Sequence, residues 1–228
     1  MFNLLGTIVN AIAIMVGSLV GIFIKRGLPD NIKETVMKGL ALCVLYLGFS
    51  GTLKGNNPLL MILSIVIGGV VGEAIDIDKA ITKLGNNIEK RFKGGESKIS
   101  QGFVASSLLF CVGSMAIVGS LESGLTGNHQ MLYAKSILDG VSSIIFSSTL
   151  GIGVMISAIS VFIYQGFITI CAALLKGILL ETVVANMTAI GSLLIIGIGL
   201  NMLGITKIKV ANLLPAVFIP IIYQLFIR

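Results

Sequence analysis

Charged residues are scarce in this chain. Asp, Glu, Lys and Arg make up only 11% of its 228 residues, against roughly 25% in soluble domains. Hydrophobic residues account for 55%, and the mean hydropathy is +1.03. A soluble core of this size could not hide so much apolar surface, whereas a lipid bilayer can. The composition therefore predicts an integral membrane protein whose partner is the lipid bilayer, with no separate soluble domain.

Side chains that perform catalysis or bind metals are also few. His129 is the only histidine, so it cannot form a histidine-based metal or nucleophile site by itself. Cys43, Cys111 and Cys171 lie in apolar segments without CxxC or other ligand spacing, which predicts small buried residues rather than disulfides. The sequence contains no Ser/His/Asp triad, Walker loop or pair of catalytic carboxylates. We therefore expect neither an enzyme nor a cofactor or metal site, and the lack of an ATP-binding motif argues against a primary pump.

Eight apolar segments are long enough to cross a bilayer, which takes about 17–25 residues per helix. The fold class is therefore an all-α polytopic membrane protein. The fifth and sixth segments follow each other so closely that seven spans, with one segment bent or re-entrant, are the alternative. The first segment begins at once and lacks a basic stretch before it, so we expect no cleavable signal peptide. The segments cover residues 3–24, 36–53, 59–75, 102–121, 131–154, 151–175, 183–203 and 210–227.

The net charge of +6 does not indicate nucleic-acid binding, because the distribution of the basic residues along the chain is explained by membrane topology. With the N-terminus outside, 12 basic residues fall on the cytoplasmic side and 3 outside, as the positive-inside rule requires. We therefore expect a protein of the bacterial cell (inner) membrane with both termini outside. The cytoplasmic residues are Lys25, Arg26, Lys33, Lys38, Lys79, Lys83, Lys90, Arg91, Lys93, Lys98, Lys207 and Lys209, and the outer ones are Lys54, Lys176 and Arg228.

One long polar stretch, residues 76–101, separates the third and fourth spans. Apolar residues recur there at helical spacing opposite Lys79, Lys83, Lys90 and Arg91. This pattern is typical of an amphipathic helix that lies in the membrane surface. We expect such a helix on the cytoplasmic side.

The two ends of the chain show a faint similarity. Lys33-Glu34-Thr35-Val36 opens the second span and Leu180-Glu181-Thr182-Val183 opens the seventh, each before a glycine-punctuated segment. With eight spans, the first three and the last three have opposite orientations, as in the inverted 3+3 repeats of secondary transporters. The alternative is that the three matching residues are coincidence. The prediction is a single membrane domain (1–228) with repeats at 1–75 and 151–228, a linker at 76–101 and central helices at 102–150.

Lys135 and Asp139 are the two charges in the middle of an apolar segment. Four residues make about one helical turn, so the two side chains share one face. An ionisable group at bilayer depth costs at least ~2.5–3.5 kcal/mol, and it therefore faces the bundle interior or water. We predict an ion or proton site in which Asp139 is the charged ligand and Lys135 is a gate or substitute cation. The alternative is a buried structural ion pair.

Other polar side chains in the spans are candidates to complete this site. Hard cations such as Na+ prefer carboxylate, carbonyl and hydroxyl oxygens. The alternative for each amide is a hydrogen bond between helices, which contributes about 0.6–2 kcal/mol. The predicted ligands are Ser142, Ser143, Asn201, Asn10 and Gln165, and Asn186 is a further amide within a span.

Three glycine-rich runs, at 16–21, 112–120 and 197–201, have two interpretations. A broken helix would expose carbonyl groups and helix ends that bind ions or substrates. Tight packing of intact helices would need only the small side chains.

Several short motifs occur in one order along the chain. They are Val112 to Ile117 (VGSMAI), Gly119 to Leu121, Gly124 to Gly127 (GLTG), Tyr133 to Gly140 (YAKSILDG), Ser148 to Val154 (STLGIGV) and Tyr164 to Gly166. With Gly6 to Asn10 and Gly197 to Asn201, they extend over essentially the whole chain and resemble the YdfK/YqgA-type bacterial membrane proteins. The resemblance implies a polytopic inner-membrane protein of the Na+ channel or pump kind, with no established substrate.

The sequence thus predicts a small membrane transporter or channel for a monovalent cation, Na+ or H+. A chain of 228 residues is small for a lone transporter, so we expect a homodimer. One alternative is a transporter of a small organic or anionic solute, with Lys135 and the N-termini of broken helices as the anion site. The other is a scaffold or sensor that transports nothing and recruits partners through the basic surface helix at residues 79–93.

Overall fold

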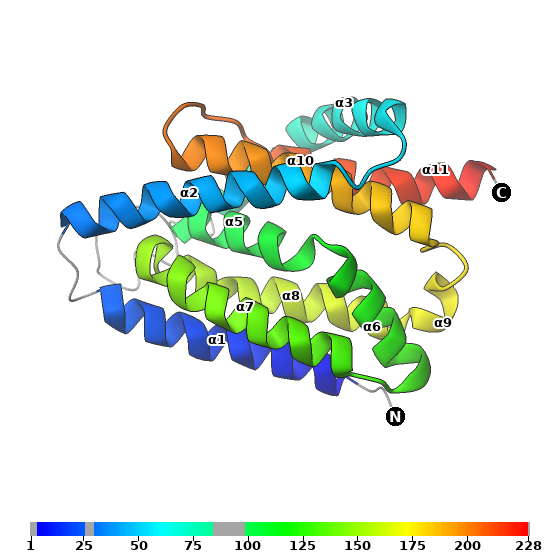
Figure 1. Cartoon of the computed structure of the whole chain (residues 1–228). Coiled ribbons are helices and arrows are strands. Elements are labelled where there is room, and N and C mark those ends of the chain that lie inside the picture. The colour runs from blue at the N-terminus through cyan, green and yellow to red at the C-terminus, as the bar shows by residue number, and fades with distance from the viewer. Residues whose placement is uncertain (1–3, 26–29, 84–98, 228) are drawn as a thin grey trace. The chain divides into compact units, whose positions relative to one another are not determined.

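The chain is helical throughout the residues that its computed structural model describes, which are 4–25, 30–83 and 99–227 (Figure 1). These ranges contain no strand. The helices are α1 (Leu5–Lys25), α2 (Asp30–Thr52), α3 (Pro58–Ile75), α5 (Ile99–Cys111), α6 (Ser114–Thr126), α7 (Gln130–Leu150), α8 (Ile152–Ile170), α9 (Ala172–Leu175), α10 (Glu181–Met202), the 3-10 helix η1 (Val210–Phe218) and α11 (Ile219–Ile227).

Five helices are long and apolar enough to cross a membrane, and a sixth span is formed if α5 and α6 are counted as one bent span. The five are α1, α2, α3, α8 and α10. The predicted helical membrane fold is confirmed, but seven or eight spans exceed this number. The polar side chains of α7 lower its hydropathy, and η1 with α11 forms a shorter apolar stretch, Val210–Phe226. The count of seven or eight and the inverted repeat stay predictions.

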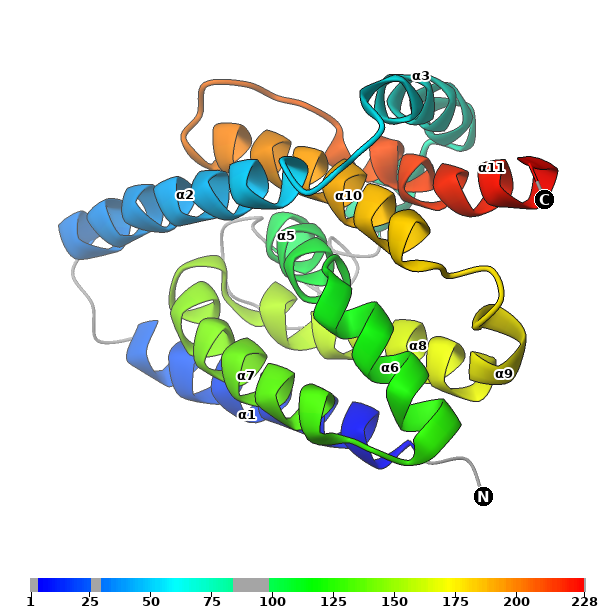
Figure 2. The same ribbon diagram turned by 45° about the vertical axis from the view of Figure 1, so that its right-hand side comes forward.

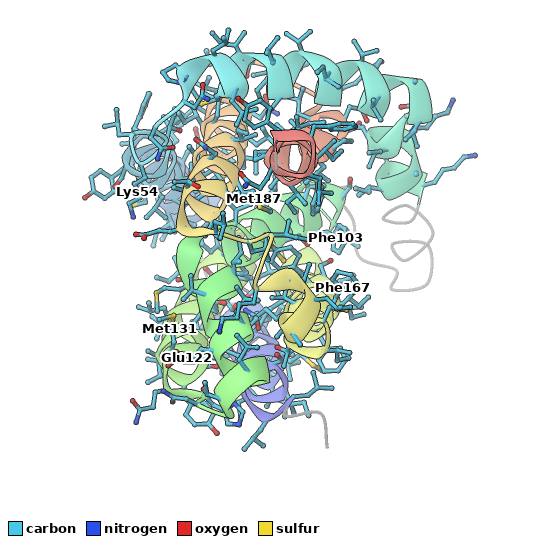
Figure 3. The ribbon with its side chains drawn as sticks, turned by 90° about the vertical axis from the view of Figure 1, so that its right-hand side faces the viewer. Lys54, Phe103, Glu122, Met131, Phe167 and Met187 are labelled. Carbon is cyan, nitrogen blue, oxygen red and sulfur yellow. The ribbon has the colours of Figure 1, made fainter. Side chains whose placement is uncertain are left out.

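The helices group into two compact units, and each unit combines segments that are distant in sequence. Unit 1 consists of Met1–Val36 and Leu84–Lys176, and unit 2 of Met37–Lys83 and Gly177–Arg228. Large apolar side chains remain exposed on both units, as expected for surfaces that face lipid. Phe167 on α8 is an example that Figure 3 shows on the outside of its helix, with 61% of its surface exposed.

In unit 1, α1 packs along α7 in the same direction, and α8 runs against both in the opposite direction (Figure 2). Near the start of α1, Gly6 lies against Leu132, and further on Gly17 lies against the backbone of Gly140. A Cβ atom at Gly17 would clash with the Gly140 carbonyl oxygen. Small residues let two helix backbones approach this closely. The run at 16–21 is therefore a packing surface within an intact helix.

The glycine-rich runs have different structural outcomes. The run at 197–201 lies within the intact helix α10, where Gly199 packs against Leu45 of α2. The run at 112–120 contains a break, because α5 and α6 meet at Gly113 with a bend of 59°. Gly113 has φ +144°, a backbone conformation that residues with a Cβ rarely adopt. Only the second run is thus a broken helix.

A single residue, Gly151, joins α7 to α8. Its φ of 75° and ψ of −150° lie in a region that is essentially restricted to glycine. The fifth predicted span, 131–154, therefore ends earlier than predicted, at Leu150, because the chain reverses there. Two separate helices follow each other at this point, as the predicted fifth and sixth segments require.

In unit 2, α2 packs on α10 and α3 packs on η1. Pro215 lies within η1, which has 3-10 geometry up to Phe218, so the predicted last span is a 3-10 helix continued by α11. The buried Asn212 side chain fixes η1 on α3: its Nδ2 donates to Glu73 Oε2 at 2.6 Å, and its Oδ1 accepts from the Asp78 backbone N–H at 2.7 Å.

The charge cluster at the end of α3 is also bonded to the segment before η1. Lys209 Nζ forms an ion pair with Glu73, and this hydrogen bond raises the pKa of Lys209. Both side chains are more than half exposed, so the pair contributes little to stability. The Glu73 carboxylate thus accepts from both Lys209 and Asn212, one on each oxygen.

The predicted surface helix lies largely outside the described residues. Its first part, residues 77–83, is helical, and Lys79 forms an ion pair with Asp76 at 3.8 Å. Residues 84–98, which hold Lys90 and Arg91, are outside the description. The amphipathic helix beyond residue 83 and the orientation of the termini stay predictions.

The close packing of α1 on α7 can be tested by replacing with alanine one glycine inside this contact and one glycine outside it. Gly17→Ala should lower the free energy of unfolding by about 1–3 kcal/mol, because its Cβ forces α1 away from α7. Gly39→Ala should instead raise it by about 0.5–1 kcal/mol, because Gly39 is exposed on α2 and no atom lies within 4 Å of a Cβ there. Thermal unfolding in one detergent, followed by circular dichroism, measures both. Equal stability of the two variants would contradict this packing.

Candidate functional site

Lys135 and Asp139 form a buried ion pair on α7. Their exposed fractions are 7% and 6%. The Lys135 Nζ lies 3.0 Å from Asp139 Oδ1 and 2.9 Å from Oδ2, so the ammonium contacts both carboxylate oxygens. The pair has the one-turn spacing predicted from the sequence, and it faces the interior of unit 1.

Two amide side chains from other helices complete the cluster. The Asn10 Nδ2 of α1 donates to Asp139 Oδ2 at 3.0 Å and also to the Gln165 Oε1 of α8 at 3.2 Å. Asn10 and Gln165 are fully buried. The α1–α7 contact brings Asn10 to a residue 129 positions away in the sequence. Four of the seven predicted site residues are thus in one hydrogen-bonded group.

The cluster leaves hydrogen-bonding capacity unused. Asn10 Oδ1 and Gln165 Nε2 are buried and have no partner among the described residues. Exchanging the oxygen and nitrogen of Asn10 would place its carbonyl oxygen against the Asp139 carboxylate, so the assignment shown is the favourable one. Buried polar groups are nearly always paired. One free acceptor and one free donor therefore lie beside the charged pair.

A second polar layer lies next to the amides. Thr7 is three residues before Asn10 on α1, and Thr169 is four residues after Gln165 on α8. Because the two helices are antiparallel, one turn along each leads toward the same end of the unit (Figure 2). Both hydroxyls are buried and have no partner among the described residues. Sequence analysis missed this layer.

Polar residues continue to the end of unit 1 at the α6–α7 loop. There the Ser123 hydroxyl and the His129 Nδ1 are 2.9 Å apart. Gly6, the neighbour of Thr7, lies close to His129, and Gly124 lies against the Thr169 carbonyl. Three polar layers thus lead from this loop to Asp139.

The serines of α7 are bonded differently from the prediction. The Ser143 hydroxyl donates to the Asp139 backbone carbonyl at 2.7 Å, so it does not contact the carboxylate. Ser147 donates to the carbonyls of Ser143 and Ser18, at 2.6 and 3.0 Å. Ser142 is half-buried and has no hydrogen bond to a described residue. Toward the α7–α8 turn, Ser143 and Ser147 are thus bonded to nearby backbone, whereas the buried Ser18 hydroxyl has no partner among the described residues.

Asn201 lies in unit 2, near the end of α10. Its Nδ2 donates to the Ile208 carbonyl at 2.7 Å, and its Oδ1 accepts from Thr206 Oγ1 at 2.8 Å and from the Ile208 N–H at 2.9 Å. These bonds hold the connection between α10 and η1. The structure thus gives Asn201 a role in a loop and does not bring it together with Asn10, Asp139 and Gln165.

The broken helix packs against α7, because both α5 and α6 contact it. Cys111 is the last residue of α5, directly before the break, and the first turn of α6 has no side-chain cap.

The cluster combines charged and neutral polar groups. It offers one carboxylate, one ammonium group, two amides and two hydroxyls. Within residues 4–25, 30–83 and 99–227, no group of three or more His, Cys, Asp or Glu residues is placed to hold a metal ion.

Comparisons with known proteins support a membrane protein family. The chain is 33% identical over 219 residues to YdfK of Bacillus subtilis, described as an uncharacterized membrane protein, with 94% of this chain and 93% of YdfK covered. It is 30% identical over 220 residues to the uncharacterized protein YqgA of Escherichia coli, with 94% of both chains covered. No solved structure matches.

The family itself is identified by a match over nearly the full length. Residues 5–225 match the family described as protein of unknown function (DUF554). This confirms the resemblance found in the sequence, and with the apolar helices it identifies a helical membrane protein. The chain therefore belongs to the DUF554 family.

Proposed function

We propose that the protein is a small membrane transporter or channel for a monovalent cation, Na+ or H+. Asp139 binds the ion, and Lys135 occupies the carboxylate when the ion is absent. Asn10 and Gln165 complete the site. The observation that carries this proposal is the buried Lys135–Asp139 pair beside amide atoms without partners.

The unpaired atoms favour a binding site over a structural ion pair. A purely structural network gains stability when all its members are bonded, and a partly satisfied one is costly in a low-dielectric interior. Here Asn10, which bonds Asp139, has an unpaired carbonyl oxygen, and the hydroxyls of Thr7 and Thr169 are unpaired about one helical turn further along α1 and α8. An incoming cation would find oxygen ligands that the resting site does not use.

Lys135 explains how the site stays neutral without its ion. Its ammonium contacts both oxygens of Asp139, which compensates the buried negative charge. A cation can bind only when this contact is broken, or a proton can bind to the carboxylate and release the ammonium. The same Lys135 thus competes with the transported ion. When the ion or a proton occupies the carboxylate, Lys135 must release its own proton or leave the site, because two positive charges and one carboxylate would leave an uncompensated charge in the interior.

The polar layers provide the route. Asn10 with Gln165, then Thr7 with Thr169, lead toward the α6–α7 loop. In the other direction Ser143 and Ser147 bind backbone carbonyls, and the buried Ser18 hydroxyl has no partner among the described residues. Glycines bring α1 against α7 on both sides of the cluster, at Gly6 and at Gly17. In this proposal ions reach Asp139 along the threonine layer, from the side of the α6–α7 loop.

The finer topology belongs to the same proposal. Seven or eight spans, with an inverted 3+3 repeat and both termini outside at the bacterial inner membrane, are supported by the 12:3 distribution of basic residues. A homodimer fits the small size of the chain, and the chemistry proposed is transport without an enzymatic step.

Replacing Asp139 tests the proposal. Asp139→Asn should reduce cation flux into liposomes at least about tenfold. A tenfold change corresponds to a loss of ~1.4 kcal/mol in the free energy of ion binding. Flux is measured for Na+, K+, H+ and chloride with purified wild-type and variant protein. The matched control is Glu181→Gln, which also converts a carboxylate to an amide but at an exposed position at the start of α10, in unit 2. It should leave flux unchanged.

A misfolded variant is distinguished by a second substitution. Asp139→Asn alone leaves Lys135 buried without its partner, which destabilises a protein by about 3–5 kcal/mol. The double variant Lys135→Met with Asp139→Asn removes both charges and should fold normally but transport nothing. Wild-type flux in this double variant would show that the pair is only structural.

Lys135 should set the apparent affinity for the ion. Lys135→Gln removes the competing ammonium, so half-maximal flux should be reached at a cation concentration at least about tenfold lower, equivalent to ~1.4 kcal/mol. The concentration dependence of flux in liposomes measures this, with folding checked by size-exclusion chromatography. A higher half-saturating concentration in a folded variant would contradict the competition.

The threonine layer should affect transport more than folding. Thr7→Val with Thr169→Val keeps the shape of both side chains and removes two unpaired hydroxyls. Because no intramolecular hydrogen bond is lost, the thermal stability should be unchanged or higher. Flux should fall if ions pass this layer. Ser120→Ala, which removes a hydroxyl already bonded to the Ala116 carbonyl, is the control, and equal flux in both variants would exclude the route.

A further inference from the structure

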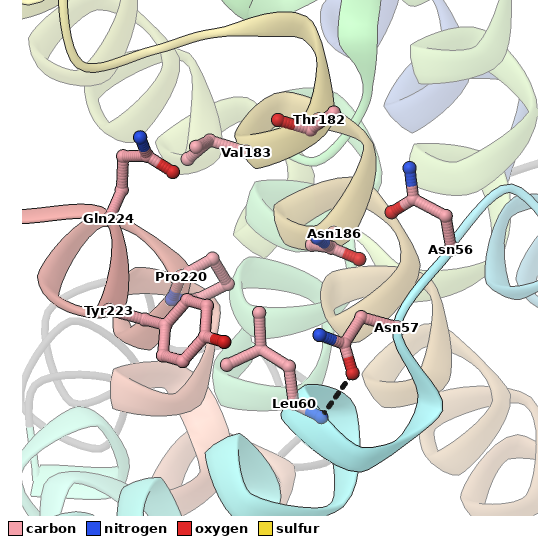
Figure 4. Close-up of a pocket in the computed structure, with 9 residues that line it drawn as sticks. All are labelled: Asn56, Asn57, Leu60, Thr182, Val183, Asn186, Pro220, Tyr223 and Gln224. Carbon is pink, nitrogen blue, oxygen red and sulfur yellow. Dashed lines mark hydrogen bonds between the residues drawn. The ribbon is translucent and has the colours of Figure 1, made fainter. Parts of the chain in front are cut away.

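Unit 2 contains a pocket of about 330 Å³ that the proposed ion site does not use. This volume lies within the usual ~300–1,000 Å³ of small-molecule sites. The pocket is formed by the α2–α3 connection, the first turns of α10, and α11 (Figure 4). Three candidate spans end or begin there. Its lining residues are Asn56, Asn57, Leu60, Thr182, Val183, Asn186, Pro220, Tyr223 and Gln224.

A second cavity adjoins this pocket. It has about 220 Å³ and shares Asn57 and Asn186 with the first. Its other lining residues are Thr52, Leu53, Gly55, Pro58, Met61 and Ala189. Asn186 therefore stands between two cavities, and its amide is available to a molecule in either.

The polar groups of the pocket are neutral and largely unused. Neither cavity is lined by Asp, Glu, Lys, Arg or His. Asn186 is half-buried, and neither it nor Gln224 makes a hydrogen bond to another residue in the described part of the chain. Asn57 uses only its carbonyl oxygen, which accepts from the Leu60 N–H at 2.9 Å (Figure 4). Its amide nitrogen is free to donate.

The pocket also has an apolar part. Leu60, Val183 and Pro220 line it next to the ring of Tyr223 (Figure 4). An aromatic ring with a polar tip can contact C–H groups with its face and donate a hydrogen bond with its hydroxyl. Together with the amides, this gives a surface that is apolar on one side and rich in donors and acceptors on the other.

We propose that this pocket binds a neutral polyhydroxyl solute, a sugar or polyol. Each hydroxyl of such a molecule donates and accepts, and the side-chain amides of Asn57, Asn186 and Gln224 offer both functions. The C–H face of a sugar matches the Tyr223 ring. A charged ligand would lose its hydration without a compensating charge in the pocket. A free sugar and the headgroup of a glycolipid share this chemistry. A glycolipid headgroup could also reach the pocket, because the pocket lies at the ends of candidate membrane spans.

This inference is independent of the ion site. The pocket lies in unit 2 and shares no residue with the Asn10, Lys135, Asp139 and Gln165 cluster of unit 1. Loss of sugar binding and loss of ion flux are therefore separate observations.

The absence of tryptophan from the chain permits a clean binding assay. Tyr223→Trp keeps an aromatic ring in the pocket and introduces the only tryptophan of the chain. The variant is placed in phosphatidylcholine nanodiscs, which avoids detergents with sugar headgroups. It is titrated with glucose, mannitol, sodium glutamate and choline chloride. We expect a saturable fluorescence change with glucose or mannitol, with a Kd of about 1 mM, and calorimetry of the unsubstituted chain should give the same affinity.

Asn186 should determine this affinity. Asn186→Ala removes the amide shared by both cavities and should weaken binding at least about tenfold, which corresponds to ~1.4 kcal/mol. Asn128→Ala, at an exposed asparagine in unit 1, is the matched control and should bind as the parent does. Asp139→Asn should also bind normally, even where it has lost ion flux.

Three results would overturn the proposal. The first is the absence of a saturable signal from glucose, mannitol or glycolipid at up to roughly 100 mM sugar, far above the expected ~1 mM. The second is equal affinity in the parent and in Asn186→Ala. The third is tighter binding of glutamate or choline than of the sugars. Nanodiscs that contain a glucosyl diacylglycerol separate the two sources. A fluorescence change with this lipid but not with free glucose would identify the headgroup as the ligand, and the reverse would identify the free sugar.

Discussion

The close contact between α1 and α7 is the constraint on which the candidate site depends. Glycine on both helices lets their backbones touch, so the short side chain of Asn10 can reach the carboxylate of Asp139. A larger residue at Gly17 would separate the helices and leave the buried charges with fewer hydrogen bonds. Because charge in a low-dielectric interior is tolerated only when it is paired and bonded, the small residues of α1 are as necessary to the cluster as its polar members.

Much of this arrangement follows from local sequence patterns. Hydropathy identifies a helical membrane protein, and a spacing of four residues places Lys135 and Asp139 on one face, where they form an ion pair. Asn10 and Gln165 could be named because an amide in an apolar segment requires a partner, and they do join the pair. The helix breaks were harder to identify, since the three glycine-rich runs look alike. Only the contacts of 16–21 and 197–201 distinguish packing from the break at Gly113.

Other features could not be predicted from the sequence for physical reasons. A threonine in an apolar helix usually bonds a carbonyl of its own helix, so Thr7 and Thr169 attract no notice until their hydroxyls prove to be unpaired. Ser143 does form such a local bond, which removes its hydroxyl from the carboxylate. Asn201 bonds loop residues five and seven positions later, a pairing that depends on the path of the chain after α10. The grouping of α1 with helices more than 100 residues later likewise depends on tertiary contacts.

The interleaved order of the two units has a consequence for synthesis. The helix α1 is complete at residue 25, but its partner α7 begins only at residue 130. At translation rates of about 5–20 residues per second, α1 waits about 5–20 s for this partner. Throughout that interval Asn10 lacks its partner Asp139, while α3 and most of α2, which belong to the other unit, have already been made. The first helix of this chain is therefore synthesised long before the residues to which it bonds in the folded unit.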